Sequence, residues 1–248
     1  MTTMLVMINL DSAVERRARM HVQLAAAGLR ALRIGVDLRV ASADRVRRTV
    51  ESTLPGLGFD LDVLSGAEVG CWLSHASAWR MMLDQPGLAA CTVIEDDLVL
   101  APHFGAAVQA LTRQTDYDLV FLGTSSKNLS TRRRSRFGGF MVHEPLGPVY
   151  NTWAYTITRR WVEALLAGGA RRIAMPIDHF LGGRGGADRP RIAVLRPPAV
   201  SEDERLGRSS QIAPYTRRID RWPLLENARR RLLASRISDW YYAMYRLR

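Results

Sequence analysis

Three consecutive acidic residues, Glu95-Asp96-Asp97, directly follow an apolar stretch with the composition of a buried strand. Because side chains alternate along a strand, we expect Glu95 and Asp97 on one face and Asp96 on the other. Two carboxylates on one face form a hard oxygen site that suits Mg²⁺ or Mn²⁺, and such ions usually also bind substrate phosphates. The cluster therefore predicts a metal site that takes a nucleotide diphosphate. An acidic turn, in which one Asp caps nearby amides, is the alternative.

Other common catalytic motifs are missing from the sequence. There is no G-x-x-x-x-G-K-[ST] loop and no G-x-S-x-G motif, which disfavours a P-loop NTPase and an ordinary α/β hydrolase. Cys71 and Cys91 have no metal-binding or disulfide spacing, so we expect two buried thiols in a reducing compartment.

Alternating strand and helix patterns must position the acidic cluster. Met4–Asn9, Leu32–Val36 and Cys91–Ile94 have the pattern of strands, and further strands are expected at 118–122, 153–157 and 192–195. Helices are expected at 102–113, at 158–167 and after two capping-box patterns, Ser12–Glu15 and Ser65–Glu68. This alternation predicts an α/β fold with a mostly parallel central sheet.

Ligands of parallel sheets bind beyond the carboxyl ends of the strands. The predicted strands therefore place Asn9, Leu10, Asp37 and the acidic cluster on one rim of the sheet.

The net charge of +11 is concentrated in two segments. Residues 215–248 carry nine arginines against three acidic residues, and residues 125–137 carry five basic residues and no acid. Apolar residues recur at helical spacing in 215–248, which predicts a basic amphipathic helix on an anionic membrane surface, or a helix packed on its own domain or on another subunit. The segment 125–137 is expected to be a basic loop that contacts acidic groups of a substrate or is solvated. We therefore predict two regions, 1–214 and 215–248, and no nucleic-acid partner.

Five motifs in order resemble glycosyltransferase family 25, which includes bacterial lipooligosaccharide galactosyltransferases and, more distantly, collagen galactosyltransferases. The matching segments are Ile8–Asp11 with Glu15–Arg17, Leu64–His75 with Trp79, Thr92–Asp97, Thr152–Arg160 and Pro176–Asp178. Asn151 stands where the family usually has Gly, and Thr158 where it has Ser. The resemblance implies a single GT-A-like (Rossmann-type) nucleotide-sugar-binding domain, a UDP-sugar donor, commonly UDP-galactose, and an inverting transfer to a sugar hydroxyl.

The resemblance also suggests roles for individual residues. Mn²⁺ or Mg²⁺ is expected on Glu95 and Asp97, with Asp96 assisting, where it stabilises the departing diphosphate. Asp178 is the leading candidate for the general base, although it could equally cap a helix or complete the metal site.

The nucleotide sugar is expected to contact Asn9, Leu10 and residues whose roles are less defined. Arg16 could meet phosphate or be solvated, Asp37 could bind uridine or ribose, and His75 could serve the donor site or pack in the core.

Taken together, the sequence predicts a transferase that adds galactose to a lipid-linked bacterial surface saccharide such as lipopolysaccharide core, a glycolipid or oligosaccharide acceptor. We see no signal peptide and no apolar run of about 20 residues. The expected location is therefore the cytoplasm, peripheral on the inner face of the bacterial inner membrane. An Arg-rich nucleic-acid-associated protein and an inactive scaffold of the same fold are the alternatives.

Overall fold

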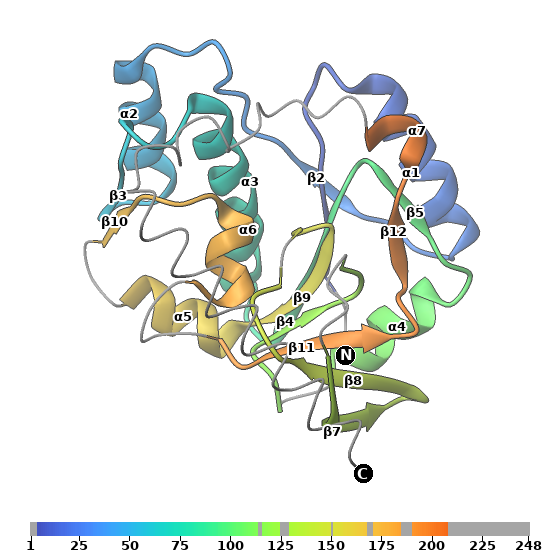
Figure 1. Cartoon of the computed structure of the whole chain (residues 1–248). Coiled ribbons are helices and arrows are strands. Elements are labelled where there is room, and N and C mark those ends of the chain that lie inside the picture. Colours follow the sequence, from blue (N-terminus) through green and yellow to red (C-terminus); the bar gives the residue numbers. More distant parts are fainter. Residues whose placement is uncertain are drawn as a thin grey trace, which may run out of the picture. The chain divides into compact units, whose positions relative to one another are not determined.

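An eight-stranded sheet with the order β2-β1-β4-β9-β6-β11-β8-β7 runs through the described part of the chain (Figure 1). The computed structural model describes residues 4–113, 116–124, 129–149, 151–167, 171–184 and 190–207. The strands of the main sheet are β1 (Met4–Ile8), β2 (Leu32–Ile34), β4 (Ala90–Glu95), β6 (Leu119–Phe121), β7 (Leu129–Phe137), β8 (Phe140–Pro145), β9 (Ala154–Thr158) and β11 (Ile192–Arg196). The predicted tail, 215–248, lies outside the described residues.

Two small sheets and a set of helices complete the fold. Parallel β3 (Leu57–Phe59) and β10 (Arg171–Ile173) form one pair, and antiparallel β5 (Leu98–Leu100) and β12 (Val200–Glu202) form the other. The helices are α1 (Val14–Ala26), α2 (Ala43–Thr53), α3 (Gly66–Leu83), α4 (Phe104–Leu111), α5 (Arg159–Ala167), α6 (Ile177–His179), the π-helix η1 (Phe180–Arg184) and α7 (Glu204–Gly207). None of the helices in the described ranges is both long and apolar enough to cross a membrane.

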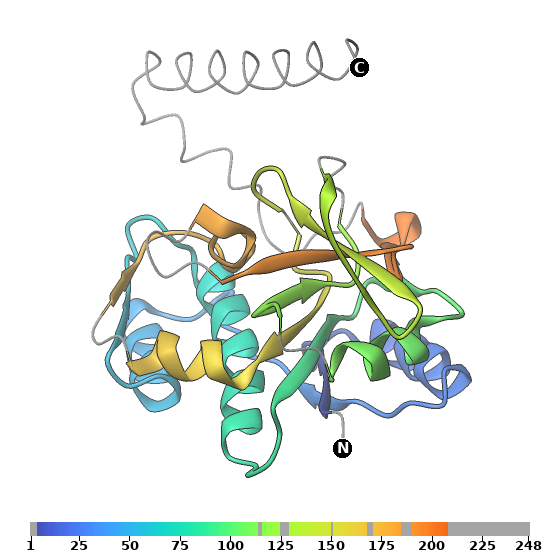
Figure 2. The ribbon, with the colours of Figure 1, turned by 90° about the horizontal axis from the view of Figure 1, so that it is seen from below.

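The helices cover the two faces of the sheet in separate layers (Figure 2). Helices α2, α3 and α5 pack on one face, and α1 and α4 pack on the other. Along β1, Val6 faces the α3 layer while Leu5 faces the α1 layer, and β4 repeats this alternation with Val93 and Ile94. A strand that is apolar on both faces is the pattern of an interior strand covered by helices on both sides.

The sheet is mixed, so the prediction of a mostly parallel sheet is wrong. Three strand pairs are parallel and four are antiparallel. The main cause is β9, which runs antiparallel to both of its neighbours, β4 and β6. The hairpin of β7 and β8 adds two further antiparallel pairs at the edge. Hydrophobic periodicity locates strands but carries no information on their direction.

The basic segment 125–137 is largely a strand rather than a loop. Residues 129–137 form β7, the edge strand of the sheet, while 125–128 lie outside the described residues. Four arginines of β7 are exposed: Arg132, Arg133, Arg134 and Arg136. Charged side chains are a common way to protect an edge strand from pairing with other chains.

Only one of the two predicted capping boxes forms. At α3, Ser65 Oγ accepts from the Glu68 amide while the Glu68 carboxylate accepts from the Ser65 amide. At α1 the N-cap is Ala13 and has no side-chain cap, so the prediction of a box at Ser12–Glu15 is wrong. The Ser12 hydroxyl instead accepts a hydrogen bond from Arg39 at 3.0 Å.

Helix α3 lies unusually close to the segment that follows β2. A Cβ on Gly66 would lie 2.2 Å from the Leu38 carbonyl oxygen, and a Cβ on Gly70 would lie 2.5 Å from that of Val36. One turn later, Ser74 Oγ accepts from the Val36 amide at 2.9 Å. These three small residues, spaced one turn apart, let the helix backbone approach the loop that carries Asp37.

Candidate functional site

The acidic cluster lies at the bend between β4 and β5, next to the end of β1. Parallel pairing aligns Glu95 with Ile8, the last residue of β1, so the residues after both strands meet at one edge of the sheet. The buried Asn9 side chain donates to Asp96 Oδ2 at 2.6 Å and to the Ala13 carbonyl at 3.0 Å. The predicted gathering of Asn9 and the acidic residues on one rim is therefore confirmed.

Arg16 points from α1 toward the carboxylates. Its Nη1 lies 3.3 Å from Asp96 Oδ1 and 3.6 Å from Asp97 Oδ2. Arg16 is therefore paired with carboxylates rather than simply solvated, and its contact with a nucleotide phosphate stays a prediction. Leu10, the other predicted residue after β1, contributes its carbonyl to the turn that begins α1, accepting from the Ala13 amide.

Glu95 is the most perturbed acid of the site. Thr152 Oγ1 donates to Glu95 Oε1 at 2.5 Å, and His75 Nε2 lies 3.8 Å from the same oxygen. Burial, followed by the nearby Asp97, raises the pKa of Glu95 to about 8. A cation bound beside Glu95 would offset the charge of Asp97, the second of these causes, and would favour the ionised carboxylate.

Asp97 has a carboxylate oxygen that no side chain satisfies. Its Oδ1 is buried and has no hydrogen-bond partner in the described part of the chain. Burial, followed by the charge of Asp96, raises the pKa of Asp97 above its usual range, and Arg16 opposes that increase. The backbone of Asp97 is fixed by the Asp203 amide, which donates to its carbonyl at 3.0 Å.

These features fit a divalent cation held by two protein carboxylates. Among the described residues there is no group of three or more His, Cys, Asp or Glu arranged as a metal site. A Mg²⁺ or Mn²⁺ ion bound through one or two carboxylates completes its coordination with substrate phosphates and water. The unsatisfied Oδ1 of Asp97 and the high pKa of Glu95 are the observations that make such an ion compatible with this site.

Asp178 lies near the cluster on α6. It is half-buried, and its charge is close enough to contribute to the raised pKa of both Glu95 and Cys71. The N-cap of α6 is Pro176, and Asp178 Oδ1 accepts from the amide of its neighbour His179 at 2.8 Å. Asp178 therefore does not occupy the N-cap position, which removes one of the three roles considered for it.

Asp37 has a salt-bridge partner of its own. Its carboxylate accepts from Arg39 Nε at 2.9 Å and from Arg39 Nη2 at 2.5 Å, and this pairing lowers the pKa of Asp37. Arg39 also reaches Ser12, so the loop after β2 is tied to the loop after β1. Asp37 thus lies on the predicted rim, with its carboxylate engaged by an arginine.

The residues before β9 are functional candidates that sequence reasoning passed over. The sequence indicates Thr152 only as part of a family motif, yet its hydroxyl contacts Glu95 directly. Asn151 has a φ of 72°, a left-handed conformation that Gly and Asn adopt most readily. This explains how Asn151 can replace the usual glycine. Tyr155 of β9 is fully buried, and its hydroxyl is hydrogen-bonded to His75.

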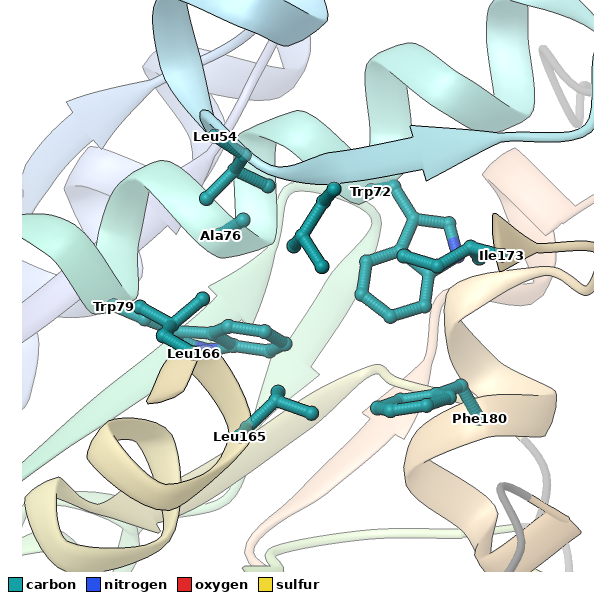
Figure 3. Close-up of a pocket in the computed structure, with 9 residues that line it drawn as sticks. Leu54, Trp72, Ala76, Trp79, Leu165, Leu166, Ile173 and Phe180 are labelled. Atoms are coloured by element: carbon teal, nitrogen blue, oxygen red, sulfur yellow. The ribbon is translucent and has the colours of Figure 1, made fainter. Parts of the chain in front are cut away.

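The cavity in Figure 3 is lined by none of these carboxylates. It has a volume of about 10 Å³ and is lined by apolar and aromatic side chains of α3, α5 and neighbouring segments, including Trp72, Trp79 and Phe180. A space of this size holds about one water molecule. The cavity is a packing defect in the core beside α3.

The fold and site define an α/β protein with a cation-compatible acidic cluster beyond the carboxyl ends of parallel strands, where such proteins bind their ligands. The chain belongs to glycosyltransferase family 25: the family model described as "Glycosyltransferase family 25 (LPS biosynthesis protein)" matches residues 1–181. The resemblance inferred from the motifs is therefore confirmed.

Individual relatives agree with this assignment. "Procollagen galactosyltransferase 1" of Danio rerio is 30% identical over 185 residues, which cover 71% of this chain and 30% of the relative. "Probable inactive glycosyltransferase 25 family member 3" of Rattus norvegicus is 31% identical over 189 residues, covering 70% of this chain and 31% of the relative. The chain thus matches about three tenths of the length of these curated relatives.

Proposed function

We propose that this protein transfers galactose from UDP-galactose, with inversion, to a hydroxyl of a lipid-linked bacterial surface saccharide such as lipopolysaccharide core. Family membership supports sugar transfer, and the zebrafish relative's name supports galactose as the sugar. The words "LPS biosynthesis protein" in the family description support the acceptor. A GT-A-like arrangement of the domain is part of the same proposal.

The observation that carries the proposal is the pair Glu95 and Asp97, in which Oδ1 of Asp97 is buried and has no hydrogen-bond partner among the described residues. These two carboxylates would hold Mn²⁺ or Mg²⁺ together with the donor diphosphate. The ion, when bound, supplies charge stabilisation for the departing diphosphate. Arg16 keeps Asp96 and Asp97 in place and reduces the repulsion between them.

Deprotonation of the acceptor hydroxyl requires a base near the anomeric carbon, and we assign this role to Asp178. Its carboxylate is half-buried and close to Glu95 without occupying the cap of α6. A carboxylate near the anomeric carbon can accept the proton of a sugar hydroxyl as the new bond forms.

The acceptor is expected to meet β7. The exposed arginines of this strand offer several guanidinium groups, which bind phosphate and carboxylate in a bidentate manner. Phosphate or carboxylate groups of a saccharide core are therefore proposed as their partners.

Attachment to the inner face of the bacterial inner membrane through residues 215–248 stays a prediction. Vesicle sedimentation of the full chain and of a chain truncated after Arg217 tests it. Loss of binding to anionic vesicles on truncation is expected, and unchanged sedimentation would refute the membrane role.

An inactive member of the family is the competing function, because the rat relative carries the words "probable inactive" in its name. Such a protein would keep the fold and bind partners without turnover.

A panel of UDP-sugars with Mn²⁺, assayed for hydrolysis and transfer, separates the two functions. We expect turnover of UDP-galactose and a loss of at least roughly a hundredfold in Asp97→Ala. Asp44→Ala, which removes an exposed acid of α2 that pairs with Arg47, is the matched control and should behave as wild type. No turnover of any UDP-sugar by the wild type, or full activity in Asp97→Ala, would exclude the proposed site.

A further inference from the structure

A chain of buried polar groups leads from the core to the acidic cluster. The indole nitrogen of Trp79 donates to the Tyr155 hydroxyl at 3.0 Å, and the same hydroxyl lies 2.7 Å from His75 Nδ1. All three side chains are at most 1% exposed. The other ring nitrogen of His75, Nε2, lies 3.8 Å from Glu95 Oε1.

The direction of these hydrogen bonds follows from the chemistry of each group. An indole N–H can only donate, so the Tyr155 oxygen accepts from Trp79. The hydroxyl has one proton left to donate, and His75 Nδ1 is its other neighbour in the described part of the chain. If Nδ1 carried a proton instead, the phenol proton would be buried without an acceptor, which is strongly unfavourable.

The proton of the neutral imidazole is therefore on Nε2. Burial lowers the pKa of His75 to about 3, which agrees with a neutral ring. Nε2 is buried and has no hydrogen-bond partner among the described residues, so its proton points to the nearest acceptor, the Glu95 carboxylate.

We propose that His75 is a positioning residue for Glu95, fixed by Trp79 and Tyr155 as the Nε2–H tautomer so that it holds Oε1 of Glu95 together with Thr152. Thr152 donates to Oε1, and the Nε2–H dipole 3.8 Å away favours negative charge on the same oxygen, which leaves Oε2 to serve the ligand. The proposal concerns which nitrogen carries the proton and involves no change of charge. Its catalytic part rests on the proposed function, whereas the tautomer does not.

The tautomer can be measured without any activity. In protein labelled with ¹⁵N-histidine, long-range ¹H–¹⁵N correlations distinguish a protonated Nε2 from a protonated Nδ1, and loss of the signals in His75→Gln assigns them among the five histidines. We expect the Nε2–H form. The Nδ1–H form would overturn the proposal, whether or not the protein transfers sugar.

A matched pair of substitutions tests positioning. The side-chain amide of Gln reaches the place of Nε2 and can still donate to Glu95, whereas that of Asn reaches only the place of Nδ1. In His75→Gln we expect kcat within about threefold of wild type; in His75→Asn we expect a loss of roughly tenfold to a hundredfold, the value of a hydrogen bond to a charged group. The acceptor KM should change little in either variant.

Controls separate positioning from packing and from failure of the proposed function. His75→Gln leaves the Tyr155 hydroxyl without its acceptor and should melt at a lower temperature than His75→Asn, so a loss of kcat confined to His75→Asn cannot come from packing. His103→Gln, which changes another histidine whose buried Nε2 has no partner among the described residues, should leave kcat unchanged. Equal loss of kcat in His75→Gln and His75→Asn would overturn the positioning role. If wild-type protein turns over no UDP-sugar, the proposed function fails, and the NMR result alone decides the tautomer.

Discussion

The acidic cluster and the arginines of strand β7 are both groups of like charge, but they differ in burial and in the contacts that they make. Glu95, Asp96 and Asp97 are partly buried and surrounded by donors from α1, from the end of β1 and from the segment before β9. The arginines of β7 are exposed. Within the described residues, Arg133 forms an ion pair with Glu144 of β8 at 3.5 Å.

The difference shows how burial changes the effect of repulsion. In the buried cluster, repulsion and desolvation appear as raised pKa values at Glu95 and Asp97, so the site favours a cation. On β7, water and salt screen the repulsion, and the arginines keep their charge available for an anionic partner. Under the proposed function, the acidic cluster would bind a cation that carries phosphate, and β7 would bind an anionic group of the acceptor.

Of the substitutions that test this comparison, Glu95→Gln is expected to have the largest effect. We expect a loss of at least roughly a hundredfold in transfer, because a neutral amide is a poor ligand for Mg²⁺ or Mn²⁺. The pKa of Glu95 is raised in the folded protein, from 4.5 to about 8. Its contribution to the free energy of unfolding is therefore complete below pH 4.5 and is lost as the pH rises through about 8.

Thermal unfolding of the metal-free protein across this pH range measures that contribution. The melting temperature of the wild type should fall more between pH 4.5 and about 8 than that of Glu95→Gln. Identical profiles would show that burial does not perturb Glu95.

Arg16→Gln tests whether the cluster needs the cationic side chain of Arg16. Without Arg16, the pKa of Asp97 should rise further, and we expect roughly tenfold lower activity at neutral pH, partly recovered at higher pH. Initial rates with UDP-galactose over a pH series provide the measurement. Arg17→Gln removes the next residue of α1, which is half-buried. It should keep nearly full activity, and an equal loss there would contradict the role of Arg16.

The combined change of Arg132, Arg134 and Arg136 to Gln tests the basic side of the comparison. We expect the acceptor KM to rise roughly threefold to tenfold and to depend less on salt, because exposed charges attract their partner through a screened field. Hydrolysis of UDP-galactose without acceptor should not change. The matched control replaces three exposed arginines of α2, Arg45, Arg47 and Arg48, by Gln. A similar rise in KM in the control would show that the β7 arginines do not bind the acceptor specifically, which would leave protection of the edge strand as their role.

The smallest expected effect concerns the helix that supports the acidic side. Ser65→Ala removes the formed capping box of α3 and should cost about 1 kcal/mol, or roughly 2–4 °C in melting temperature. Ser12→Ala, at the place where the sequence predicts a box that does not form, should change stability by less than about 0.5 kcal/mol. Calorimetry of both variants measures the two losses of stability. Equal losses would contradict the inference that only α3 has a capping box at its N-terminus.

The elements that carry the acidic cluster could be predicted because their signals are local. The apolar run before Glu95, the cap at Ser65 and the match of Thr152–Arg160 to a family motif each depend on a few neighbouring residues. Structure places β4 at Ala90–Glu95 and α3 at Gly66–Leu83, as these signals indicate.

The errors have one physical origin, which is pairing between distant segments. The direction of β9 depends on where its chain enters the sheet, and the strand at 129–137 exists because it pairs with β8. Arginine neither strongly favours nor disfavours a strand. Without knowledge of the pairing with β8, the run of charges at 125–137 therefore predicts a loop. Likewise, contact between Glu95 and Thr152 joins residues 57 positions apart, and only the family motif pointed to it.

The close approach of α3 to the loop after β2 has a consequence for laboratory evolution of this protein. Any larger residue at Gly66 or Gly70 would meet a backbone carbonyl at 2.5 Å or less, which no rotamer can relieve. Libraries that seek new donor preference should therefore leave both glycines fixed. They should vary instead half-buried positions on the same helix, such as Ala67.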